Sequence, residues 1–423
     1  MKRLQVFFLL GILGTLSVIG TIIYSNKLIQ SNEKVNTLTK VEMLEDFEYL
    51  YNTLKDNYPY FEINKRLNNV DWLGKKDEYI KKIDACIDDK SFLYTLQGIL
   101  AELDNGHTQM ITTKQAYDSV KESEGQNGQS SPWLEQINDE KVVQRYSSMN
   151  SENSSNTGNI NKSNIQSNKQ RNTTSSNLYT QTFPDKSIAY FKVKSFNNKY
   201  DEQDRKLLEP FFDEIKDYKT LIIDIRDNGG GSNTYWQNNI ISKLIKEPLS
   251  YKFYYIFRGA GFAEKFIKYK QGIGYDQMKP ISSMDKNVLL NAPPEVKKNY
   301  KYYYENNVTI NPKESINFEG KIYLLVNNKV FSSSEMFAVV AKNTKFATIA
   351  GEKTGGDGIG LGPIIRKLPN SGYLFRFSQV MGLTSEGMCD EEYKTEPDIK
   401  VSAKVNPNVL EDDAIQYILK LAK

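Results

Sequence analysis

The hydrophobic pattern divides the chain into four stretches, of which the first is an apolar N-terminus. From Leu4 to Asn26 the sequence carries no charge, and apolar residues would cover every face of a helix. A helix of this length can cross about 30 Å of hydrocarbon. Because Lys2 and Arg3 precede it, we expect a single-pass anchor over residues 1–27, with the remainder on the extracytoplasmic side of the cell membrane. A cleaved signal peptide is the alternative.

Residues 28–118 are predicted to form an N-terminal helical subdomain. Between 40 and 54 apolar residues recur every three or four positions, which predicts an amphipathic helix that ends near Pro59. A second apolar stripe over 92–103 predicts another helix, with Ser91 as its N-cap. That helix stops at a breaker sequence, Asp-Asn-Gly, and the loop that follows completes the subdomain.

The third stretch, residues 119–185, is predicted to be a linker. Within it, 23 of the 31 residues from 147 to 177 are Ser, Asn, Thr or Gln. So polar a segment cannot bury enough apolar surface to fold. We therefore expect a disordered surface insert there, and the sequence assigns it no role.

Short β-branched and aromatic runs then alternate with helix-sized segments, which predicts an α/β core over 186–423. The predicted strands are 187–193, 220–225, 321–326, 346–350 and 373–377, and the predicted helices are 201–217 and 333–342. The predicted fold is thus an α/β core, an N-terminal helical subdomain and one transmembrane helix.

Composition excludes several kinds of site. His107 is the single histidine, so no zinc site can rest on two or three imidazoles of one chain. Cys86 and Cys389 are too few for a four-thiolate zinc site or an iron–sulfur cluster, and whether they pair stays open. We therefore expect no metal and no cofactor. With 55 basic and 52 acidic residues and no basic block, nucleic acid is not an expected partner.

A glycine-rich loop follows the predicted strand 220–225 and is the first candidate for chemistry. It reads Asp-Ile-Arg-Asp-Asn-Gly-Gly-Gly-Ser over 224–232. Consecutive glycines let the backbone approach a ligand and present bare N–H groups, as oxyanion sites require. A phosphate loop is the rival interpretation, but no Gly-Lys-Ser/Thr follows.

Ser332 is the second candidate, because it lies on the turn between a predicted strand and a predicted helix. Ser332 and Glu335 fit a capping box, in which both side chains satisfy free N–H groups at the helix start. The same turn is where hydrolases place a nucleophilic serine, with the following N–H groups directed at the oxyanion. The pattern alone leaves both interpretations open.

Five motifs in this order resemble the C-terminal processing (tail-specific) serine peptidase superfamily, in particular its histidine-using branch related to the tricorn protease core. The resemblance covers about 40–104 and 186–402, and it implies a core of crotonase-like type. The motifs read DNGHT at 104–108, DIRDNGG at 224–230, SSSE at 332–335, GEKTGG at 351–356 and EPDI at 396–399.

The resemblance implies a set of catalytic positions. The nucleophile falls on Ser332, and the N–H of Ser333 with one from Gly229 or Gly230 would form the oxyanion hole. The tail-specific branch carries a catalytic lysine where this chain has Asp357. An aspartate cannot replace that neutral amine, so the general base would be His107.

The histidine branch also places a glutamate shortly before the Pro-Asp segment, where it orients the imidazole. The matching position here is Glu391, with Glu392 as the adjacent alternative. The tricorn-like pattern has a serine relay before the histidine, and this chain has Gly106 there. The carboxylate would therefore reach His107 directly, or water or Thr108 would fill the gap.

These expectations combine into a membrane-anchored, extracytoplasmic serine endopeptidase that acts on protein or peptide substrates through an acyl-enzyme on Ser332. One alternative is a catalytically inactive peptide- or lipid-binding protein on the same fold, which Asp357 and Gly106 favour. Another is an unrelated α/β hydrolase or nucleotide-binding protein, in which Ser332 and His107 would lie far apart. The pattern predicts neither the oligomeric state nor the substrate.

Overall fold

We describe the protein from a computed structural model of the chain. It describes residues 37–125, 131–149, 172–174, 177–183, 185, 187–259, 267–269 and 275–421. The expected anchor over 1–27 and most of the Ser/Asn-rich insert lie outside these ranges. Among the helices described, none combines the length and apolar character needed to cross a membrane.

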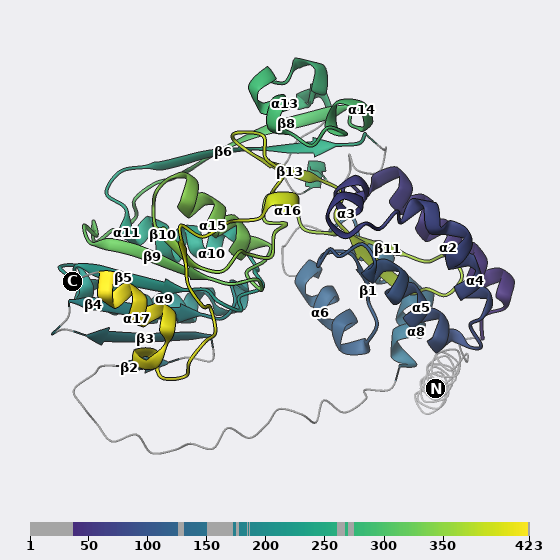
Figure 1. Cartoon of the computed structure of the whole chain (residues 1–423). Coiled ribbons are helices and arrows are strands. Elements are labelled where there is room, and N and C mark those ends of the chain that lie inside the picture. The colour runs from purple at the N-terminus through teal and green to yellow at the C-terminus, as the bar shows by residue number, and fades with distance from the viewer. Residues whose placement is uncertain are drawn as a thin grey trace, which may run out of the picture.

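A seven-stranded sheet forms the centre of the core, in the order β14-β10-β9-β5-β4-β3-β2 (Figure 1). Neighbours from β4 to β14 run parallel, whereas β2, β3 and β4 are antiparallel. The strands are β2 (Asn172–Thr174), β3 (Leu178–Phe183), β4 (Ile188–Val193), β5 (Thr220–Asp224), β9 (Lys321–Val326), β10 (Thr348–Gly351) and β14 (Ile399–Lys400). The predicted strands at 187–193, 220–225, 321–326 and 346–350 are confirmed within one or two residues.

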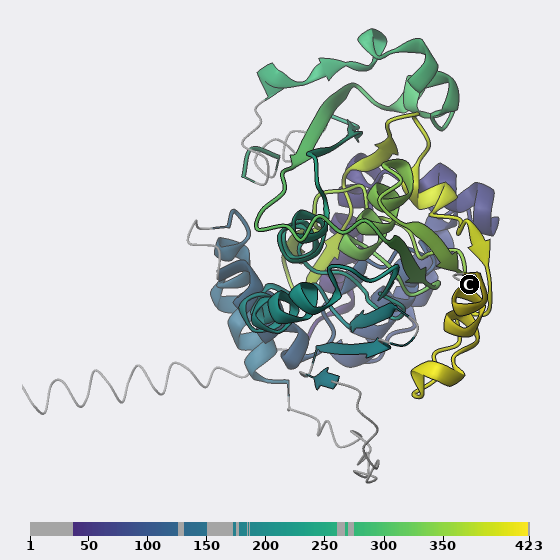
Figure 2. The same cartoon turned by 90° about the vertical axis from the view of Figure 1, so that its left-hand side faces the viewer.

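Helices cover both faces of this sheet, which explains why β5 is buried along its length. On one face α9 (Asp201–Ile215) places Phe211 and Phe212 against Phe191 of β4, and α15 (Ser333–Asn343) contacts β9 and β10. On the other face α17 (Asp413–Leu421) forms a second apolar cluster with the sheet. Figure 2 shows the sheet between these layers. The predicted helices 201–217 and 333–342 are confirmed.

The N-terminal part is helical, as predicted, and it covers a small sheet of order β1-β12-β11. Its elements are α2 (Lys40–Asn57), α3 (Phe61–Asn68), α4 (Lys76–Asp84), α5 (Asp89–Ala101), β1 (Gln109–Met110), α6 (Lys114–Gly125), α7 (Leu134–Ile137) and α8 (Glu140–Ser147). The strands β11 (Ile364–Lys367) and β12 (Leu374–Phe377) come from the core sequence. The predicted strand 373–377 is thus present, but it pairs with the helical part.

Two details of the helical part differ from prediction. The N-cap of α5 is Asp88, and Ser91 is the third helical residue of the capping box, because its hydroxyl returns to the Asp88 N–H. The range 119–147, expected as linker, contains α6, α7 and α8. Buried residues of these helices, among them Ile137 and Tyr146, pack into the main apolar core.

A third part projects above both others in Figure 1. It is a sheet of order β13-β6-β8-β7 with two short helices. Its elements are β6 (Leu249–Phe257), β7 (Lys279–Pro280), α13 (Lys286–Asn291), α14 (Val296–Asn299), β8 (Tyr302–Ile310) and β13 (Met381–Thr384). The short helices α10 (Asn233–Trp236), α11 (Ser242–Leu244) and α16 (Asp390–Tyr393) complete the fold.

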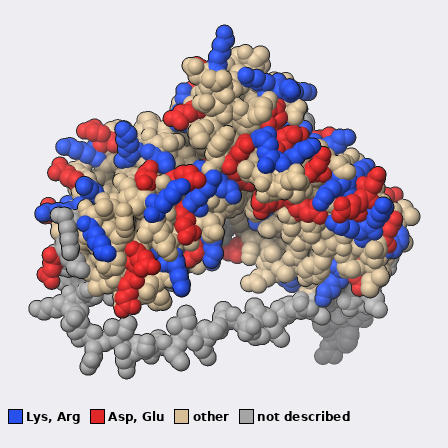
Figure 3. Space-filling view, in the orientation of Figure 1, with Lys and Arg blue, Asp and Glu red and all other residues tan. Residues whose placement is uncertain are grey.

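The surface shown in Figure 3 mixes the two signs of charge, without a large patch of either. It is hollowed between the core on the left and the helical part on the right. The Cys86 and Cys389 side chains are both buried and free.

Candidate active site

Ser332 lies directly before α15, on the turn that leads from β9 into that helix. Its backbone has φ 59° and ψ −127°, a conformation that residues other than glycine rarely adopt. Its side chain makes no capping hydrogen bond, so the capping-box interpretation is wrong. Glu335 instead accepts a hydrogen bond from Thr395 Oγ1 at 2.6 Å. The Ser332 hydroxyl is therefore left available for another partner.

That partner is His107, which lies 225 positions earlier in the sequence. The distance from His107 Nε2 to Ser332 Oγ is 3.1 Å. On the other side of the ring, Nδ1 lies 2.7 Å from Asp357 Oδ2. Because a hydroxyl, an imidazole and a carboxylate are in line, the arrangement has the geometry of a nucleophile, base and orienting acid. Ser332 and His107 thus meet as predicted, and the two are not far apart as the unrelated-fold alternative required.

The ring of Phe331 packs against the imidazole, with 4.7 Å between the ring centroids. This contact explains Gly106, which stands where the resemblance has a serine. A Cβ at Gly106 would lie 2.8 Å from Phe331 Cζ, which is too close without movement of the ring. The imidazole needs no relay from position 106, because Asp357 reaches it directly.

Asp357 is buried and surrounded by donors. Its Oδ2 accepts from Asn105 Nδ2 and Ser378 Oγ, each at 2.9 Å, and Oδ1 accepts from Tyr60 OH at 3.1 Å. Burial alone would raise the pKa of this carboxyl. The charge and hydrogen bond of His107, with the hydrogen bonds from Asn105 and Ser378, outweigh burial and hold its pKa below the ordinary value. Asp357 is therefore ionised at neutral pH.

Asn105 connects the histidine loop to this carboxylate, and the sequence analysis did not single it out. Its Nδ2 bonds both Asp357 and Glu391, while its Oδ1 accepts from the His107 N–H at 3.2 Å and from Thr108 Oγ1 at 2.8 Å. Thr108 thus supports the loop and does not bridge to a carboxylate. Its place within the DNGHT motif was the only signal that could have found Asn105.

Glu391 does not contact His107, so its predicted role as the orienting carboxylate needs correction. Its Oε1 accepts from Asn105 Nδ2 at 3.0 Å, and its Oε2 is buried with no hydrogen-bond partner among the described residues. Burial and the charge of Asp357 raise the pKa of Glu391 well above its ordinary value, so it is a neutral acid. The alternative, Glu392, pairs with Arg66 at 2.7 Å. Asp357, which stands where the tail-specific branch has a catalytic lysine, occupies the position that orients the His107 imidazole.

The predicted oxyanion donors separate into two kinds. The Gly230 N–H donates to Asn228 Oδ1 at 2.9 Å and is therefore engaged, which corrects its prediction. The N–H groups of Gly229 and Ser333 donate to no acceptor within the described part of the chain. The glycine-rich loop is fixed from below by Arg226, which is fully buried and pairs with Asp224 and Asp412. Two N–H groups thus stay free beside the Ser332 turn.

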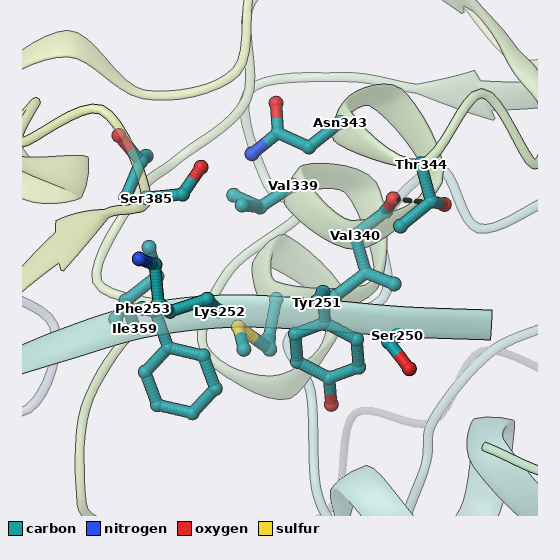
Figure 4. A pocket seen from close by; sticks show the side chains of 12 residues that line it. Ser250, Tyr251, Lys252, Phe253, Val339, Val340, Asn343, Thr344, Ile359 and Ser385 are labelled. Atoms are coloured by element: carbon teal, nitrogen blue, oxygen red, sulfur yellow. Dashed lines mark hydrogen bonds between the residues drawn. The ribbon is translucent and has the colours of Figure 1, made fainter. Parts of the chain in front are cut away.

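A pocket of about 160 Å³ lies farther along α15 (Figure 4). Met336, Val339, Val340 and Asn343 form its wall on the helix, and Ile359 and residues of β6 and β13 lie opposite. Its lining includes none of Ser332, His107 and Asp357. Within the described residues, no group of three or more His, Cys, Asp or Glu side chains is arranged to hold a metal ion.

Comparison with known proteins supports the description of the fold. The sequence model described as Peptidase family S41 matches residues 187–401, which is just over half of the chain. No curated protein matches the chain. A crystal structure of a candidate peptidase from Parabacteroides merdae aligns at 20% identity and TM-score 0.55, covering 90% of this chain and 96% of that one. Mature CPAF in complex with lactacystin aligns at 13% identity and TM-score 0.54, covering 91% and 98%. At these identities the two structures show a shared fold.

Proposed function

The chain belongs to peptidase family S41 and is a serine-type peptidase, and from this premise we propose that Ser332, His107 and Asp357 form its catalytic triad. The observation that carries the proposal is the continuous contact from Ser332 Oγ through the imidazole to Asp357 Oδ2. Each member comes from a different segment of the chain, so an accidental alignment of all three is an unattractive explanation.

The contacts assign a role to each side chain. With Nδ1–H donated to Asp357, the neutral imidazole presents a free Nε2 to the serine hydroxyl. As Ser332 Oγ attacks the peptide carbonyl, His107 takes the hydroxyl proton, and Asp357 stabilises the imidazolium that forms. His107 then gives this proton to the leaving amine as the C–N bond breaks. Water, deprotonated by the same nitrogen, releases the acid and restores the Ser332 hydroxyl.

The developing oxyanion requires donors on the other side of the carbonyl. The free N–H groups of Gly229 and Ser333 lie on the two loops that meet at the nucleophile, and we assign this role to them. Such donors act before the reaction begins, because the loop and the first turn of α15 already hold them in place.

We propose a location for the activity on the basis of the sequence. The uncharged segment 4–26 after Lys2 and Arg3 supports a membrane anchor, with the peptidase on the extracytoplasmic side. Substrates would be proteins or peptides in that space. Fractionation of cells that express the full chain or a chain beginning at residue 28 tests this part, since only the full chain should sediment with membranes.

The binding-protein alternative loses its two supporting features. Gly106 and Asp357 favoured it because they depart from the motifs of related peptidases. Gly106 leaves room for the Phe331 ring, and Asp357 lies in hydrogen-bond contact with His107. Neither departure opposes catalysis.

A serine-directed fluorophosphonate probe tests the proposal. We expect the wild-type chain to be labelled and to release peptides from denatured proteins, and we expect Ser332→Ala to abolish both. Ser334→Ala is the matched control, since the Ser334 hydroxyl is buried without a partner among the described residues and lies two positions away. Labelling that persists in Ser332→Ala, or no labelling of the wild type at all, would contradict the assignment.

A further inference from the structure

Two buried acids accept hydrogen bonds from backbone N–H groups of the loop that carries Asp357. The Gly356 N–H donates to Glu335 Oε2 at 3.4 Å. The N–H groups of Gly358 and Ile359 donate to Asp390 Oδ2 at 2.5 and 3.0 Å. The chain is therefore held on both sides of Asp357 by carboxyl groups that the catalytic steps do not use.

These two acids connect the loop to the nucleophile helix. Glu335 lies in the first turn of α15, three residues after Ser332, and Asp390 is the first residue of α16. Their exposed fractions are 0% and 4%. The charge of Asp390 acts on Glu335 across this buried region. The acids thus form one buried unit between the nucleophile helix, the Asp357 loop and α16.

The loop also rests directly on α15. A Cβ at Gly358 would lie 2.4 Å from the Met336 nitrogen and 2.7 Å from Glu335 Cβ, so only glycine fits there. Asp357 itself has a positive φ of 50°. Because the loop is tight and strained, its position depends on the groups that hold it, and the separation between Asp357 and Ser332 depends on that position.

The charge of the unit is set by its surroundings. In the described part of the chain no lysine or arginine pairs with Glu335 or Asp390, and Asp357 and Glu391 face the same buried region. Two adjacent buried negative charges are unfavourable. Burial and the charge of Asp390 raise the pKa of Glu335 to about 8. Burial raises that of Asp390 to about 6, against the opposing effect of its two N–H donors. Glu335 therefore holds the proton.

We propose that Glu335 and Asp390 are positioning residues that hold the Asp357 loop against the start of α15, so that Asp357 meets His107. Glu335 accepts the N–H that precedes Asp357, and Asp390 accepts the two that follow it. The catalytic consequence of this arrangement rests on the proposed function, whereas the structural consequence does not.

The single histidine provides a direct readout. In the full-length chain labelled with ¹⁵N-histidine, the proton on His107 Nδ1 is the one ring N–H facing Asp357, and its downfield NMR signal reports that contact. We expect Asp390→Ala to lose this signal and to lower kcat about 100-fold, with KM changed less than about threefold. Glu335→Ala should behave similarly. Glu335→Gln should keep the signal and retain kcat within about fivefold, because its amide oxygen can still accept the Gly356 N–H.

Asp46→Ala is the matched control. Asp46 is also a fully buried aspartate that accepts two backbone N–H groups, from Asn370 and Ser371, and neither belongs to the site. The Asp46→Ala variant should be less stable than the wild type, whereas its His107 NMR signal should be unchanged. A His107 signal retained in Asp390→Ala would overturn the positioning role, and equal losses in Glu335→Gln and Glu335→Ala would overturn the role of Glu335 as an acceptor for the loop. If Ser332→Ala proved as active as the wild type, the proposed function would fail while the NMR test would stand.

Discussion

At the scale of single residues, the ionised Asp357 is the feature on which the site depends most. It is 4% exposed, yet four side chains donate to it: His107, Asn105, Ser378 and Tyr60. The donors come from three separate segments of the chain, namely the loop of Asn105 and His107, the residue before α3 and the residue after β12, so the carboxylate is stable only in the assembled fold. This arrangement lets a buried charge stabilise the imidazolium without a neighbouring lysine or arginine.

Asp357→Asn should lower kcat/KM about 10³- to 10⁴-fold, because the amide removes the charge and favours the wrong imidazole tautomer. The measurement is kcat/KM of the wild type and the variant on a peptide that the wild type cleaves. The melting temperatures of the two proteins check that the variant is folded. Glu391→Gln is the matched control, since neutral Glu391 also bonds Asn105 but does not touch His107. Similar losses in both variants would argue against Asp357 as the third member of the triad.

The motifs that carry the family resemblance were enough to predict Ser332 and His107, whereas the turn before the predicted helix left the role of Ser332 open on its own. They could not predict Asp357, because its contact with His107 spans 250 positions and depends on a loop with positive φ. Glu391 had the right charge and an acceptable position in the sequence. Its side chain bonds Asn105, which lies between it and the imidazole of His107.

At the scale of elements, α15 and the loop 355–359 form one unit that presents Ser332 and Asp357 together. Periodicity predicted α15 and the strand before it nearly to their ends, since both are strongly apolar. The helices α6 to α8 were missed because each gives only a weak signal: α6 buries Tyr117 alone among its described residues, and α7 and α8 have only four and eight residues. Their packing partners are distant in sequence, including β11.

The buried acid pair predicts how stability changes with pH. Glu335 has a pKa of about 8 in the fold, against an ordinary 4.5, so between these values the folded state binds more protons than the unfolded state. Unfolding free energy therefore decreases as pH rises through this interval. Glu335→Gln removes this dependence. The melting temperature of the variant minus that of the wild type should therefore increase by at least about 2 °C from pH 5 to pH 8. Parallel melting curves at all pH values would contradict the raised pKa.

At the scale of the whole molecule, the helical part brings His107 and the core brings Ser332 and Asp357. Arg66 of α3 links these parts, because its guanidinium pairs with Glu392 of α16 at 2.7 Å and with Glu295, next to α14, at 2.9 Å. One side chain thus joins the helical part, the core and the projecting sheet. The class of fold was predictable from hydrophobic pattern, but this junction was not, because its residues look like ordinary surface charges in the sequence.

Arg66→Ala should lower the free energy of unfolding by about 1–3 kcal/mol, since it leaves two largely buried glutamates without a partner. The guanidinium is partly exposed, so solvent screening keeps the loss below that of a fully buried ion pair. Arg66→Lys should recover little, because an ammonium cannot bond both carboxylates in the same plane. Urea unfolding measures both. The control is Lys65→Ala, which breaks an exposed pair with Asp71 and should change little. An equal effect of the Lys65 and Arg66 variants would contradict the junction.

The backbone at Ser332 has a consequence for how this protein could change over generations. A residue with a side chain at φ 59° costs on the order of 1–3 kcal/mol of conformational free energy. The gain in return is the position of the Ser332 hydroxyl. Glycine would relax the turn, so loss of the nucleophile would stabilise the chain. Selection for folding alone therefore cannot retain this serine. Where peptide hydrolysis ceased to matter, the same fold could persist as a more stable, inactive protein. Replacement of Ser332 by glycine would be among the first changes in its sequence.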